Sequence, residues 1–85
     1  MRLADDDAEI AAARRDYAQV LQMQDHWNES EEPLLMSWSV LGPGDALCAR
    51  VIENLASHWE ELGRTDDSAR LREMLEESTR AAAQH

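Results

Sequence analysis

The sequence predicts an all-α fold: a small bundle of three main helices plus a short fourth helix, forming a single domain over residues 1–85. Three observations support this prediction. Apolar side chains recur at three- and four-residue steps in three stretches, as on the buried faces of amphipathic helices. Both prolines and two of the three glycines lie within residues 33–44, between these stretches. The chain also lacks a pair of alternating segments that could join as strands.

The first helix is predicted over about residues 5–28. Its start is rich in aspartate and glutamate, which suit the positive end of a helix dipole and its unpaired amides. One apolar row follows helical spacing, with Leu21 beside it: Ile10, Ala13, Tyr17, Val20, Gln24 and Trp27. This row is close to a heptad pattern, so we expect a partner helix to cover it, from this chain or from a second copy.

A short helix is predicted over about residues 33–41, the most apolar part of the chain. Pro33 can occupy a first helical turn, and Gly42 followed by Pro43 can end the helix. The same residues alternate as in a strand, but a lone strand would leave its backbone unpaired. We expect Leu34, Trp38 and Leu41 to close a thin core; the alternative is that this run faces a partner.

Two further helices are predicted over about 46–62 and 66–82. Asp45 is the expected cap of the first, and Gly63 is expected to end it. Its buried face repeats with a helical period: Cys48, Val51, Ile52, Leu55, Trp59 and Leu62. The second has a weaker inner face around Leu71 and Leu75. Because their connection is short, we expect an antiparallel hairpin.

The charge balance limits the classes of partner. The chain carries 18 acidic and 8 basic residues, a net charge of −10. Such a chain repels nucleic-acid phosphates, so we expect no direct nucleic-acid binding, and it attracts basic protein surfaces. It holds no apolar stretch of about 20 residues, so no membrane segment is expected. Cys48 is the only cysteine, which fits a reducing cytoplasm.

The residues that usually carry chemistry do not form a recognisable site. His26, His58, His85 and Cys48 are not spaced as metal ligands on one helix. The glycines of residues 42–44 lack the lysine and spacing of a phosphate-binding loop. Cys48 is expected to be a buried small apolar residue. We therefore expect no catalytic residues, no metal and no cofactor, and a protein that is not an enzyme.

One segment resembles a known family. Residues 41–52, LGPGDALCARVI, are similar to the start of the second helix of carrier proteins, where an LGxxS signature precedes a helix. In that family the serine carries the phosphopantetheine arm. The matching position here is Asp45, or Ala46 in a shifted match, and neither can carry the arm. The resemblance therefore implies an inactive carrier-protein-like domain.

The favoured function is that of a small acidic, non-catalytic protein–protein interaction module: a regulator, adaptor or accessory subunit that acts through an apolar helix face. Its partner is another protein, and a homodimer through the first helix is the simplest form. The expected partner-binding residues are Trp27, Leu35, Met36, Trp38, Trp59, Glu31 and Glu32. The alternative is a phage or mobile-element inhibitor that mimics nucleic acid against a nucleic-acid-binding machine such as a CRISPR effector. The inactive carrier is a weaker alternative.

Overall fold

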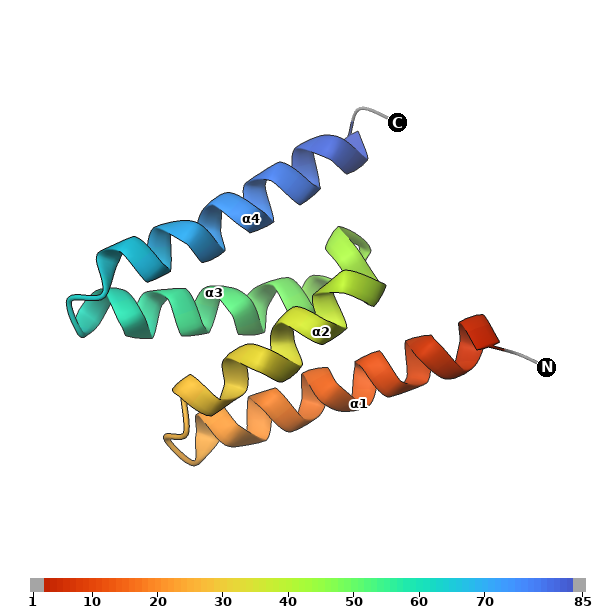
Figure 1. The fold of residues 1–85 in the computed structure, drawn as a ribbon, viewed down its shortest axis with the longest axis horizontal. Helices are drawn as coiled ribbons and strands as arrows, with labels where there is room; N and C mark the ends of the chain where they lie inside the picture. Colours follow the sequence, from red (N-terminus) through yellow and green to blue (C-terminus); the bar gives the residue numbers. More distant parts are fainter. Residues whose placement is uncertain (1–2, 84–85) are drawn as a thin grey trace.

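The computed structural model describes residues 3–83 and shows the expected all-α bundle (Figure 1). The elements, in chain order, are α1 Leu3–Met23, η1 Asn28–Ser30, α2 Glu31–Leu41, η2 Gly42–Gly44, α3 Ala46–Glu61 and α4 Thr65–Ala83, where η denotes a short 3-10 helix. No strand occurs within these residues, so the strand alternative for the apolar run is excluded. Within the same range, no helix combines the length and the apolar character that crossing a membrane requires.

The helices form two antiparallel hairpins, α1 with α2 and α3 with α4 (Figure 1). α2 packs on α3 and joins the hairpins, and both hairpin turns lie at the same end of the molecule. The result is a flat body, 45 × 33 × 15 Å along its principal axes. Every helix of so thin a body has a face toward solvent, which leaves room for outer surfaces as well as a core.

The predicted helix bounds agree with the structure to within two residues, except at the end of the first helix. α1 ends at Met23 instead of near residue 28, because the chain turns into the left-handed region at Asp25 (φ 64°). The amide of His26 donates to the carbonyl of Leu21 (2.7 Å), and the amide of Asp25 donates to that of Gln22 (3.0 Å). These two bonds form a Schellman motif, which satisfies the last helix carbonyls.

α3 ends with the same motif. Gly63 takes the left-handed position (φ 85°), as expected from the sequence. The amide of Arg64 donates to the carbonyl of Trp59 (2.8 Å), and the amide of Gly63 donates to that of Glu60 (3.1 Å). Glycine adopts this conformation without the steric penalty of a Cβ atom. The chain therefore reverses tightly into α4.

The core lies between α2, α3 and α4, with one face of α1 against it. Leu34 and Trp38 are 1% and 7% exposed, which confirms that they close the core. The Trp38 indole Nε1 also donates to Oγ of Ser78 on α4 (3.2 Å). The remaining members of the cluster are Ala18, Cys48, Val51, Ile52, Leu55, Ala56, Trp59, Leu71 and Leu75, and Leu41 packs against them.

α1 buries a different row from the one that the sequence singled out. Its inner residues are Ala11, Ala18, Leu21 and Gln22, and the two alanines are essentially inaccessible. Small side chains let the neighbouring helices approach closely. Gln22 is 6% exposed, and its Nε2 donates to the carbonyl of Val51 on α3 (3.1 Å). This bond connects the first hairpin to the second through the interior.

Candidate interaction surface

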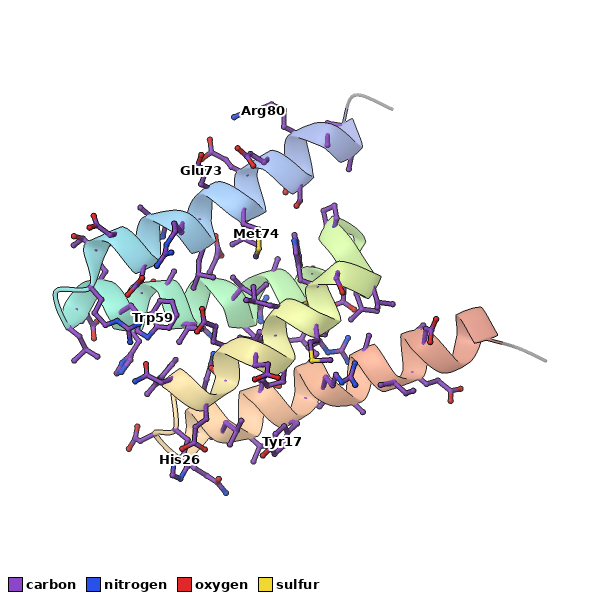
Figure 2. The ribbon with its side chains drawn as sticks, in the orientation of Figure 1. Tyr17, His26, Trp59, Glu73, Met74 and Arg80 are labelled. Atoms are coloured by element: carbon purple, nitrogen blue, oxygen red, sulfur yellow. The ribbon has the colours of Figure 1, made fainter. Side chains whose placement is uncertain are left out.

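The outer side of α1 carries a row of exposed apolar side chains: Ile10, Ala13, Tyr17 and Val20, called the α1 row below. Ile10 is 49% exposed, Tyr17 58% and Val20 46%. Tyr17 projects from the edge of α1 away from α3 and α4, whereas Trp59 and Met74 lie among the helices (Figure 2). Among residues 3–83, no helix covers the α1 row, which belongs to the predicted heptad pattern.

α2, which packs along α1, adds further exposed apolar residues. Met36 is 40% exposed and Val40 48%, whereas Leu35, which is 36% exposed, borders a hollow lined by Trp59, Leu71 and Met74 of α3 and α4. Glu32 is exposed on the same helix, and Glu31 is half-buried. Contiguous apolar side chains at a protein surface commonly mark contact sites for other proteins. The first hairpin, with α1 and α2, therefore holds most of the large exposed apolar side chains of the described chain.

The three tryptophans expected at a partner surface have internal contacts instead. Trp38 is 7% and Trp59 2% exposed, so neither is offered to a partner in this fold. Trp27 is half-buried and stacks on His58, with ring centroids 4.3 Å apart and an interplanar angle of 13°. Periodicity could not separate them from surface residues, because apolar residues line both the inner and the outer faces of these helices.

Sequence reasoning also missed a set of polar contacts beside Trp59. Oδ1 of Asn28 accepts from the Trp59 indole (2.8 Å) and from the Arg64 guanidinium (2.8 Å). The Arg64 guanidinium carbon lies 4.3 Å from the centroid of the Trp59 ring. A single asparagine in a polar stretch gives no periodic signal. The one available hint was that a buried tryptophan needs an acceptor for its indole N–H.

Arginines on the second hairpin are largely engaged within the chain. Arg64 and Arg70 both bind Asp67, and Arg72 on α4 binds Glu60 on α3. Exposed carboxylates remain on all four described α-helices: Asp7, Glu9, Glu32, Glu53, Glu61, Asp66, Glu73 and Glu77. The exposed negative charge is therefore spread over all four helices and is not confined to one of them.

Asp45, where a carrier protein would have its serine, has structural contacts here. Its Oδ1 accepts from the amide of Cys48 (2.8 Å), which caps α3 as the sequence predicts. Its Oδ2 accepts from the guanidinium of Arg15 on α1 (2.7 Å). The aspartate thus fixes the start of α3 against the first hairpin.

Cys48 is buried within the core, as expected. Burial raises the pKa of its thiol, and the contact of its Sγ with Oγ of Ser37 (3.6 Å) offsets this only in part. A thiol with a raised pKa is a weak nucleophile at neutral pH. Among the residues whose placement is described, no three His, Cys, Asp or Glu side chains gather as metal ligands would.

An open groove of about 600 Å³ lies between α3 and α4. Its lining combines small and apolar side chains with charged ones: Ala49, Glu53, Arg72, Leu75, Glu76, Thr79, Arg80 and Ala83. Both arginines are in ion pairs, Arg72 with Glu60 and Arg80 with Glu76. The groove therefore presents no convergent set of unpaired polar groups that would define a small ligand.

Comparisons of the chain with protein-family models, with curated protein sequences and with solved structures find no match in any of the three.

Proposed function

We propose that the protein is a small acidic, non-catalytic interaction module that contacts another protein through the α1 row. The observation that carries this proposal is the exposure of Ile10, Tyr17 and Val20 along one side of a 21-residue helix. Covering such a row removes apolar surface from water, and each Å² of apolar surface buried contributes about 25 cal/mol of favourable free energy. Tyrosine is also among the residues that contribute most to binding at protein interfaces.

The two hairpins would have different roles. α3 and α4 supply most of the core and hold the fold, while α1 and α2 present the contact surface. Met36 and Glu32 stay within the proposed surface as exposed residues on α2, whereas Leu35 lies on the side of α2 that faces α4. Trp38 and Trp59 contribute by keeping the bundle folded. We place the module in the cytoplasm, where the buried thiol of Cys48 would stay reduced.

The distribution of charge favours this module over an acidic mimic of nucleic acid. A mimic needs its carboxylates in one array that can occupy a basic channel. Here the exposed carboxylates lie on all the described α-helices. Binding through an apolar row should not weaken as salt is raised from low to moderate concentration, whereas binding through carboxylates should weaken steeply.

A photo-reactive amino acid at position 17 tests the proposal. The matched control is the same substitution at Asn54, an exposed residue on α3. We expect a defined covalent adduct from position 17, none from position 54, and loss of the position-17 adduct when Val20→Glu is added. Circular dichroism should show both labelled chains folded. Equal labelling from both positions, or no adduct from position 17 in the purified protein and in cells, would contradict the proposal.

A further inference from the structure

We infer that the occupant of the α1 row is a second copy of this chain, with the two α1 helices packed side by side and parallel. This inference rests on the proposed function, because it uses the same surface. It makes that function specific by naming the partner, the orientation of the helices and the charged residues that fix the orientation.

The spacing of the row is that of a two-stranded coiled coil. Ile10 and Tyr17 take heptad position a, and Ala13 and Val20 take position d. In a parallel pair, each a or d residue packs beside the same residue of the partner. The row spans about two heptads, which is short for an isolated coiled coil. The exposed Met36 and Val40 on the adjoining α2 add apolar surface to the same hairpin.

Two charges beside the row select the parallel arrangement. Glu9 takes position g and Arg14 takes position e of the next heptad. In a parallel pair these positions face each other across the seam, so Glu9 meets the partner's Arg14, and two-fold symmetry repeats the contact. Neither residue forms an ion pair with another side chain whose placement the structure describes. Both charges are therefore available for the contact.

An antiparallel pair fits the charges less well. With the same four apolar residues in register, Arg14 lies near the partner's Arg14, and Asp16 lies near the partner's Asp16. Like charges in these flanking positions disfavour an arrangement. Asp16 is partly neutralised by Arg15 of its own chain (3.1 Å), but Arg14 has no such neighbour among the described side chains.

The net charge of −10 on each chain opposes self-association, and a parallel pair also brings the acidic starts of the two α1 helices together. Added salt screens both effects over about 8–10 Å. It also weakens the Glu9–Arg14 contacts, which are fewer than the repelling charges. We therefore expect the dimer to form more tightly at moderate salt than at very low salt, the opposite of an acidic mimic bound to a basic surface.

A charge-exchange series measured by analytical ultracentrifugation tests the orientation. Glu9→Arg and Arg14→Glu should each weaken the wild-type dimer by about tenfold, since each converts two attractive contacts into repulsive ones. The double variant should return to within about threefold of wild type. Glu53→Arg, on α3, is the control. It places the new charge away from the seam, so it should not weaken the dimer. Single variants without effect, or a double variant as weak as the singles, would overturn the parallel arrangement.

A single cysteine gives an independent readout. In Ala13→Cys, oxidation should join two chains through position 13, because identical d residues face each other in a parallel pair. Cys48 is buried and is left unchanged, and Asn54→Cys is the control that should stay unlinked. A wild-type chain that stays monomeric at all concentrations would overturn self-pairing. If position 17 then cross-links to a different protein, the result supports the proposed interaction module and refutes only the proposal that its partner is a second copy of this chain.

Discussion

The indole Nε1 of Trp59 donates to Oδ1 of Asn28 across 2.8 Å, and this contact joins the end of α3 to the connection between α1 and α2. The guanidinium of Arg64 donates to the same oxygen and lies over the Trp59 ring. Beside it, Trp27 stacks on His58. Aromatic stacking, a cation–π contact and a shared acceptor thus hold this end of the bundle together.

Replacing Asn28 with alanine should lower the free energy of unfolding by about 0.5–1.5 kcal/mol, because the indole N–H of Trp59 loses a part-buried hydrogen bond. Asn54→Ala is the matched control, since Asn54 is exposed on α3, and it should change stability by less than about 0.5 kcal/mol. Urea unfolding followed by tryptophan fluorescence measures both. Equal effects of the two substitutions would show that the Asn28 contact does not stabilise the fold.

Gln22→Ala should destabilise the protein by about 1–3 kcal/mol. The substitution removes the buried donor that bridges to Val51 and Ser30 and leaves a small void between the hairpins. Gln19→Ala is the control, because Gln19 is exposed on the same helix. Thermal unfolding monitored by circular dichroism compares them. A Gln22 variant as stable as the Gln19 variant would mean that the hydrogen bonds of Gln22 make no net contribution to stability.

Trp38→Ala should cost about 3–5 kcal/mol, as expected for removing a buried aromatic side chain from a core. For a domain of this size, that loss can exceed the total stability. Met36→Ala, on the exposed side of the same helix, should cost less than about 1 kcal/mol. Trp38→Phe keeps most of the apolar volume, so it should fold and reveal the smaller contribution of the bond to Ser78. A folded, stable Trp38→Ala variant would contradict the placement of Trp38 in the core.

Asp67 should make stability depend on pH in the acid range. Hydrogen bonds from Arg64 and then Arg70 hold the pKa of the Asp67 carboxyl below its ordinary value. The folded form therefore binds fewer protons, so the stabilisation is present above the ordinary pKa and is lost as pH falls through the folded-state pKa. Asp67→Asn should destabilise the protein most at neutral pH, with a difference from wild type that shrinks toward acid. Carboxyl NMR titration should show the low pKa directly, and Asp66→Asn is the control.

Periodicity was sufficient to predict α3, α4 and most of α1, whereas α2 also needed the argument that a lone strand would leave its backbone unpaired. Pro33 and Gly42 located α2 to within two residues, and Asp45 as a cap gave the start of α3. The end of α1 was missed because its turn uses Asp25, and aspartate in a left-handed conformation leaves no distinctive sequence signal. Glycine at position 63, by contrast, marked the equivalent turn after α3 correctly.

The proposed contact surface was only partly predictable from the same periodicity. The row through Ile10 and Tyr17 was recognised as needing a partner, but the pattern did not tell whether this chain supplied it. The neighbouring row with Ala11 and Ala18 was the one that packs internally, and alanines carry little weight in an apolar pattern. Long-range contacts such as the one between Asn28 and Trp59 depend on how the hairpins meet, which no local spacing encodes.

The pairing of each helix with its sequence neighbour also has a kinetic consequence. α1 packs mainly on α2, and α3 mainly on α4, so most native contacts join segments that are close along the chain. Chains dominated by such local contacts lose little loop entropy before their helices meet, and they commonly fold within microseconds to milliseconds. We expect the two hairpins to form first and to dock last, with Trp38 and Trp59 reporting the docking step.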